Sequence, residues 1–295
     1  MFLKLIDMAI AGYQGQGDPA DYERLQFFRQ VWGVQDQLIA KAGKPDYDMP
    51  SPQALRAWNQ EAESVLSHKP VSIDMDALAS ACREIANCII SQDALGDEVN
   101  QALSQAEWET LLESADMSLA GKDPAAFVAA VADVAQDQFS EDLSVTVAMV
   151  ASLALRTQLE TVAADIYKAM LSAAADVPRP VNCPVCGGQA TLARVGLTRS
   201  KNGRAKELWC SQCGTAWEFE RVRCGRCGTQ NQNHIHYFSL EGDDSHRIQN
   251  CDECGNYVRT LYQDEAVSAF SYEVEDVVMA KLDQVAFEQA KAQAE

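Results

Sequence analysis

The sequence has no apolar run long enough to cross a bilayer. A membrane span needs about 18 consecutive apolar residues, and the most apolar run, residues 145–155, is shorter and is followed by Arg156. The opening residues 1–12 are apolar, but Lys4 and Asp7 interrupt them and no small-residue cleavage site follows. We therefore expect no membrane span and no export signal, and we place the protein in the cytoplasm.

Basic residues are also scarce. The net charge is −19, and residues 1–182 hold 27 acidic against 12 basic side chains. Residues 183–262 hold 8 acidic against 10 basic side chains, and residues 263–295 hold 8 against 2. An acidic protein repels a phosphate backbone. The charge therefore argues against a nucleic-acid partner and favours a protein or peptide partner.

Catalytic motifs are missing as well. The chain contains no phosphate-binding loop, no dinucleotide fingerprint and no Ser/His/Asp set. Nothing else in the sequence supplies a nucleophile paired with a base. We therefore expect a protein that is not an enzyme.

What the first part of the chain does contain is helical patterning. Residues 1–176 have apolar residues at helical spacing, separated by Gly- and Pro-containing breaks. Asp18, Ser51 and Asp123 each precede a proline, which is the pattern of an N-cap followed by the first helical residue. The run 143–171 is the richest in Ala, Val and Leu, so it predicts the most buried helix. We predict an all-α helical bundle domain over residues 1–176.

Composition changes after the segment Asp-Val-Pro-Arg-Pro at 176–180, because its two prolines end the helix. We place a metal-binding domain at residues 177–262 and an acidic C-terminal helix at residues 263–295. Helical spacing returns from Glu265 onward. The expected apolar face of this helix comprises Val274, Val277, Val278, Leu282, Val285 and Phe287.

Eight of the ten cysteines form four Cys-x-x-Cys pairs. The pairs are Cys183 and Cys186, Cys210 and Cys213, Cys224 and Cys227, and Cys251 and Cys254. Adding 41 to the first four positions gives the last four, so the unit is a tandem duplication. Two such turns joined by a hairpin supply four thiolates to one tetrahedral ion. We predict these eight cysteines as ligands of two metal ions, in an α+β chain with two tandem rubredoxin-like or zinc-ribbon modules.

A glycine follows every pair, at positions 187, 214, 228 and 255. Glycine adopts positive φ without strain, which lets the turn curl so that backbone N–H groups point at the sulfurs. Thioredoxin-like redox dithiols are the competing interpretation, but they occur once, at a helix start, rather than in tandem. The repeated detail favours metal binding.

Two questions stay open at the level of the residues. A cage of four thiolates suits Zn²⁺ and rubredoxin-type iron alike, so spacing does not identify the ion. The pairs also combine either consecutively or as a cross-brace. The duplication favours consecutive pairing, with each ribbon folding locally.

Aromatic and basic residues flank the cysteine pairs. We expect Trp209 and Trp217 to cover the first site and to fill a thin core, and Arg221 and Arg223 to offset thiolate charge. Histidines in the second ribbon are alternative ligands, but four thiolates already complete a site, so surface or strand positions are expected. These histidines are His234, His236 and His246.

Around the cysteine pairs the sequence resembles the formate dehydrogenase accessory protein family, FdhE. The resemblance is carried by Cys183-Pro-Val-Cys-Gly187, by LWCSQCGTAWEFERVRC at 208–224 and by CDECGNYVRTLYQ at 251–263. It extends more loosely to residues 17–39 and 274–289. One departure is Lys206-Glu207-Leu208, where the family usually has Arg-Tyr-Leu.

The resemblance implies an assembly factor that acts in the cytoplasm on the catalytic subunit of a molybdenum- or tungsten-dependent formate dehydrogenase. It also implies iron rather than zinc in the two sites, with zinc as the alternative. Whether the chain forms a homodimer is left open. A rubredoxin-like iron protein that transfers electrons is the second hypothesis, and a nucleic-acid-binding zinc ribbon is disfavoured by the charge.

Overall fold

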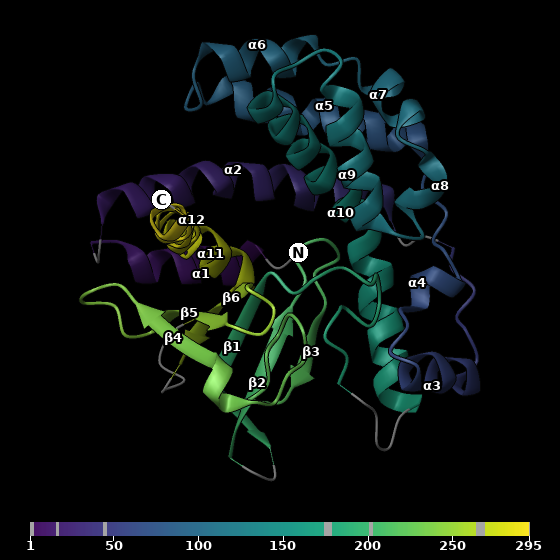
Figure 1. Cartoon of the computed structure of the whole chain (residues 1–295). Coiled ribbons are helices and arrows are strands. Elements are labelled where there is room, and N and C mark those ends of the chain that lie inside the picture. The colour runs from purple at the N-terminus through teal and green to yellow at the C-terminus, as the bar shows by residue number, and fades with distance from the viewer. Residues whose placement is uncertain are drawn as a thin grey trace.

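The structure is a computed structural model that describes residues 3–15, 18–43, 46–173, 179–200, 203–263 and 269–294. Within these ranges helices come first, then a sheet, then two further helices (Figure 1). The chain therefore combines helices and a sheet, as predicted. The predicted domain boundary at 176–177 and the expected helix start at Glu265 lie outside the described residues.

The helices of the first part are α1 (Leu3–Tyr13), α2 (Pro19–Ala42), α3 (Pro52–Gln60), α4 (Val65–His68), α5 (Met75–Ser91), α6 (Asp97–Gln105), α7 (Trp108–Ser114), α8 (Met117–Ala120), α9 (Pro124–Ala135) and α10 (Glu141–Ala173). The later elements are β1 (Leu192–Ser200), β2 (Gly203–Trp209), β3 (Ala216–Phe219), a 3-10 turn (Gln232–His234), β4 (Ile235–Ser239), β5 (His246–Cys251), β6 (Tyr257–Tyr262), α11 (Tyr272–Val278) and α12 (Ala280–Ala294). The described part of residues 3–173 contains no strand.

The predicted caps fix three helix starts. The side chain of Asp18 accepts a hydrogen bond from the backbone N–H of Ala20, and Ser51 and Asp123 each accept one from the residue three positions on. In all three helices proline stands at the first helical position, where its missing N–H costs nothing. These predictions are confirmed.

Helix α10 is the central element. It has 33 residues, and its length of roughly 50 Å follows from a rise of 1.5 Å per residue. Its buried side chains include Val147, Ala151, Leu155, Leu159 and Ile166. Figure 1 shows α10 passing from the layer of α5 and α9 down beside the sheet, next to α3. Helix α10 thus packs both within the helical part of the chain and against the part that contains the sheet.

The six strands within the described ranges form one sheet, in the order β3-β2-β1-β6-β5-β4. Strands β1 to β3 and strands β4 to β6 are each antiparallel, and β1 pairs with β6 in parallel from Leu192–Arg259 to Val195–Tyr262. Each half of the sheet belongs to one copy of the duplicated unit. The two units are therefore joined edge to edge, a connection that the cysteine spacing does not predict.

The two C-terminal helices pack back onto the start of the chain. Val274, Val277 and Val278 of α11 lie in a cluster with Ile6 of α1 and Leu25 of α2. Figure 1 shows α11 and α12 beside these N-terminal helices and over the sheet.

Most of the predicted apolar face of the C-terminal helices is buried, and Leu282 is 1% exposed. The expectation for Phe287 is wrong, because its side chain is 71% exposed. Leu282 and Ala286 of α12 pack in a cluster with Leu192, Ile248 and Leu261 of the sheet. Among the described helices, none is long and apolar enough to cross a membrane.

Candidate metal centres

The four Cys-x-x-Cys-Gly turns, called knuckles one to four in chain order, have the same backbone geometry. In each, the N–H of the glycine donates to the carbonyl of the first cysteine, at 2.8 to 3.0 Å. The N–H of that first cysteine in turn donates to the carbonyl five residues on, at 2.8 to 3.0 Å. Each chain segment thereby turns back on itself and presents both cysteine side chains from one side of the turn.

The glycines in these turns are required by conformation. Gly187, Gly214, Gly228 and Gly255 have φ between +66° and +79°, in the left-handed region. A side chain there costs about 1–2 kcal/mol. The prediction that glycine supplies positive φ after each pair is confirmed.

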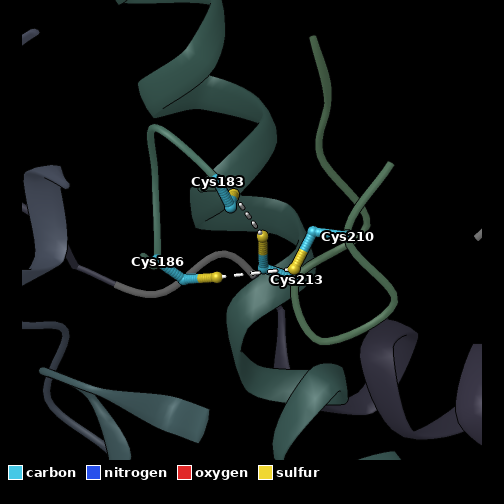
Figure 2. Close-up of side chains that lie close together, drawn as sticks. All are labelled: Cys183, Cys186, Cys210 and Cys213. Atoms are coloured by element: carbon cyan, nitrogen blue, oxygen red, sulfur yellow. Dashed lines mark hydrogen bonds between the residues drawn. The ribbon is translucent and has the colours of Figure 1, made fainter. Parts of the chain in front are cut away.

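The eight sulfurs gather in two groups of four. Site one consists of Cys183, Cys186, Cys210 and Cys213, and site two consists of Cys224, Cys227, Cys251 and Cys254. Within each group all sulfurs lie within 4.8 Å of one another, so either group could hold a metal ion. The structure therefore combines consecutive knuckles and not a cross-brace. Figure 2 shows the four side chains of site one converging.

Sulfur spacing matches a tetrahedral cage. In site one the Sγ atoms of Cys183 and Cys213 are 3.5 Å apart, and those of Cys186 and Cys210 are 3.6 Å apart (Figure 2). In site two the Sγ atoms of Cys227 and Cys251 are 3.8 Å apart. A tetrahedron with metal–sulfur bonds of about 2.3 Å has edges of about 3.8 Å. All eight cysteines are free of disulfides, and the donor set fits Zn²⁺ or iron equally.

Charge explains why such a group needs a cation. Burial raises the pKa of the Cys183 thiol well above its ordinary value. Hydrogen bonds from the other three thiols, that of Cys183 first, lower the pKa of Cys210. Neighbouring thiolates also repel one another, which disfavours the ionisation of all four thiols in one group without a cation. A divalent ion removes this obstacle, because coordinated thiols lose their protons.

Site one lies between the sheet and the helices. Its four cysteines are 1–2% exposed and belong to the main core cluster of the helical part. The first two N–H groups of α4 donate to the carbonyls of Pro184 and Val185 in knuckle one, both at 3.0 Å. Knuckle two is held on α10, because Gln212 and Ser152 exchange hydrogen bonds of 3.0 and 3.4 Å.

Site two, which consists of knuckles three and four, is more open than site one. Cys224 and Cys251 are buried, whereas Cys254 is partly exposed and Cys227 is exposed. The backbone N–H of Arg226 donates to the sulfur of Cys224 at 3.4 Å. Such N–H···S bonds stabilise a thiolate.

Among the flanking residues, Trp217 lies beside site one as predicted, whereas Trp209 does not. Arg223 donates to the carbonyl of Gly228 at 2.9 Å, so it braces knuckle three through its backbone, and Arg221 is exposed. Of the two tryptophans only Trp217 lies in the cluster of site one. Trp209 belongs to the cluster under α12, because neighbouring residues of a strand point to opposite faces.

None of the three predicted alternative ligands, His234, His236 and His246, belongs to either sulfur group of the described residues. His234 and His236 flank knuckle four at the surface, paired with Glu253 and Asp252. Strand β5 begins at His246, which is buried and belongs to neither sulfur group. Four thiolates complete each site without them.

Lys206 has a role that the sequence did not reveal. It is 1% exposed, and its amine donates to Gln249 at 2.6 Å and to the carbonyl of Arg223 at 3.2 Å. Burial lowers its pKa to about 8, against the attraction of Cys224. The amine thus links the two halves of the sheet beside site two. The only sequence signal was its departure from the family pattern.

Comparisons with known proteins agree with the knuckle resemblance. No family model matches the chain. The protein named FdhE from Escherichia coli O1:K1 is 33% identical over 86 residues, which cover 28% of this chain and 26% of that protein. An FdhE homolog from Citrobacter koseri is 32% identical over 111 residues, or 36% of this chain and 34% of that protein. In these matches the chain thus spans about a quarter to a third of the length of its curated relatives.

The fold extends the similarity over the whole chain. The crystal structure of the FdhE protein from Pseudomonas aeruginosa matches with a TM-score of 0.59 at 19% identity, covering 98% of this chain and 91% of that chain. At this identity the match shows the fold. Sequence and fold together confirm the predicted resemblance to the FdhE family.

Proposed function

We propose that this chain, which shares the FdhE fold and is similar to FdhE proteins in sequence, is a non-enzymatic assembly factor for the catalytic subunit of a formate dehydrogenase. The observation that carries the proposal is the fold match over 98% of the chain, together with the sequence match to curated FdhE proteins. The protein acts in the cytoplasm, on a molybdenum- or tungsten-dependent client, before the client is complete.

The chain binds two metal ions, one in each site, with all eight cysteines as ligands. Iron in a rubredoxin-like site is favoured and zinc is the alternative. Four protein ligands complete a tetrahedral ion, whereas catalytic sites keep a position open for water or substrate. The complete ligand sets therefore support a structural or recognition role rather than turnover of formate.

The client surface includes a groove to which both halves contribute. It has a volume of about 570 Å³ and lies between α1, α10, β2, β3 and the segment that leads into α11. Apolar lining residues include Trp209, Phe270 and Tyr272. At the rim Leu5 is 46% exposed and Leu171 is 63% exposed. An apolar segment of the client would bury these side chains.

Deletion of the gene tests the proposed function. A host without it should still make the catalytic polypeptide of the formate dehydrogenase in normal amount but should show little formate oxidation. The full chain supplied on a plasmid should restore the activity, and the purified chain alone should not oxidise formate. Full activity in the deletion host would overturn the proposal.

A rubredoxin-like electron-transfer protein is the second candidate. It is favoured by the exposure of Cys227, because an iron–thiolate site near the surface is accessible to a redox partner. Metal analysis and the visible spectrum of anaerobically purified protein test this second candidate. Two zinc ions without colour would exclude electron transfer, whereas iron with a colour that dithionite removes would support it.

A further inference from the structure

The two sites have the same sequence spacing but different surroundings. All four cysteines of site one are 1–2% exposed. In site two the second cysteine of each knuckle, Cys227 and Cys254, reaches the surface, while Cys224 and Cys251 stay at 2% and 0% exposure. One side of site two therefore faces solvent, and no side of site one does.

Packing separates the sites in the same way. The cysteines of site one belong to the main core, together with Leu66 of α4 and Leu155 of α10. Figure 2 shows helical ribbons close to the four cysteine side chains of site one. The buried cysteines of site two share a small cluster with Ile235, on which Cys254 packs.

Hydrogen bonds that anchor the knuckles also distinguish the two sites. The knuckles of site one are hydrogen-bonded to α4 and to α10, which are parts of the helical half. The described anchors of knuckle three run to residues outside the helices. Arg223 donates to the carbonyl of Arg179, and Arg226 donates to the carbonyl of Tyr257 at the start of β6 and to Gln189, between knuckle one and β1. Opening site two therefore disturbs fewer contacts than opening site one.

We propose that site two is the exchangeable metal centre of this chain, opening at Cys227, and that site one is a permanently held centre that joins the helical half to the sheet. The inference rests on the metal-binding part of the proposed function. It divides two sites that the sequence makes equivalent into one structural site and one reactive site.

Exchange at site two is a ligand substitution. An incoming thiolate or chelating carboxylate binds the ion from the solvent side, and the bond to the Cys227 sulfur breaks. The oxidation state of the ion does not change, and the released Cys227 thiolate takes a proton from water. Site one offers no comparable path, because an attacking group has no exposed sulfur to displace and the helices would have to separate first.

Chelator competition on the full chain tests this inference. The chain is loaded with two Zn²⁺ ions and mixed with an excess of a chromophoric chelator under native conditions. We expect one equivalent to leave roughly tenfold or more faster than the other, since supporting groups around a metal change its affinity by 10–100-fold. Release of both ions in a single phase would overturn the inference.

Alkylation identifies which site opens, and it needs no variant. Iodoacetamide is added during the fast phase, and the labelled cysteines are mapped by mass spectrometry. Cys227 should be labelled first, followed by the rest of site two, while site one stays unlabelled. Labelling of Cys183 or Cys186 in the fast phase would contradict the assignment.

A matched pair of variants completes the test. Cys227 and Cys186 occupy equivalent positions in the duplicated unit. Cys227→Ser should remove the fast phase and keep the slow one. If Cys186→Ser fails to fold, the labelling pattern of the unmodified chain still shows which of the two sites opens first. If the unmodified chain binds fewer than two metal ions, the metal-binding part of the proposed function is wrong instead.

Discussion

The backbone N–H of Leu66 donates a hydrogen bond to the carbonyl oxygen of Val185, at 3.0 Å. The first N–H groups of a helix have no partner within the helix, and Ser64, at the N-cap of α4, makes no side-chain capping bond. Knuckle one takes over this role. Helix and metal turn therefore depend on each other.

This dependence predicts that the two sites contribute unequally to stability. Cys210→Ser and Cys251→Ser change equivalent positions that are equally buried, at 1% and 0% exposure. Each variant should lose one metal ion and keep the other. Cys210→Ser should lower the melting temperature more, because loss of the ion from site one also releases knuckle one from α4. Each α4 N–H left unpaired then costs about 1–3 kcal/mol. Metal content and thermal unfolding check this prediction. Loss of both metals from either variant would show that the sites fold as one unit.

A second prediction concerns Gly214, which has φ of +76°. A Cβ atom there would lie 3.2 Å from an Arg156 guanidinium nitrogen and 3.4 Å from Glu160. Gly214→Ala should destabilise the protein by about 1–2 kcal/mol through the backbone alone, and further by displacing knuckle two from α10. Urea unfolding and zinc affinity are the measurements.

Gly242→Ala is the matched control. Gly242 has φ of +84°, and a Cβ atom there would meet nothing within 4 Å. It should show the backbone cost without a change in zinc affinity. Equal losses of stability in the two variants would mean that contact with α10 contributes nothing.

A third prediction follows from His246, which links distant parts of the chain. Its Nδ1 lies 2.7 Å from Asp243 and its Nε2 lies 2.9 Å from Glu275, which also accepts a hydrogen bond from Tyr13. Burial lowers the pKa of His246, but the bonds to and charges of the two carboxylates outweigh it and raise the pKa to about 9. The same imidazole holds the pKa of Asp243 below its usual range, although burial opposes this.

The sign of the pH dependence follows from the raised pKa. An unfolded histidine has a pKa of about 6.5, so this stabilisation is complete below that pH and is lost as the pH rises through about 9. His246→Gln should therefore cost about 1–3 kcal/mol at pH 6, and less above pH 9. The exposed pair of His236 and Asp252 is the control, and His236→Gln should change stability little at either pH. A cost for His246→Gln that is independent of pH would contradict the charged assignment.

Local features of this fold could be predicted from the sequence, because they depend on neighbouring residues. Asp18, Ser51 and Asp123 cap helices as expected. The glycine after each cysteine pair has positive φ as expected. The favoured consecutive pairing of knuckles also follows, because the duplicated unit keeps its partners within 31 residues of each other.

Non-local features could not be predicted. The parallel pairing of β1 with β6 brings Leu192 opposite Arg259. The alternation of side chains along a strand predicts which face of the sheet a residue occupies, but not which strand lies beside it. The bond from Tyr13 to Glu275 spans 262 positions. The burial of site one arises from α4 and α10, whose sequences carry no sign of a metal partner. Phe287 continues the helical pattern, yet its side chain is exposed.

The last prediction tests the client groove. Leu171 lies on α10 at its rim and is 63% exposed, so its replacement removes little packing within the protein. Leu171→Glu should change the free energy of unfolding by no more than about 0.5 kcal/mol, as surface changes usually do. It should also keep both metals. If an apolar client segment binds there, burying the new carboxylate without a partner costs several kcal/mol, so the variant should restore little formate oxidation in the deletion host.

Leu95→Glu is the control for this variant, because Leu95 is also exposed, at 41%, and does not line the groove. It should restore the activity as well as the unmodified chain does. Co-purification of the client with each variant gives a second readout that is independent of catalysis. If Leu171→Glu restores full activity and retains the client while Leu95→Glu does not, the groove is not the client site, and the exposed surface around Leu95 would take its place.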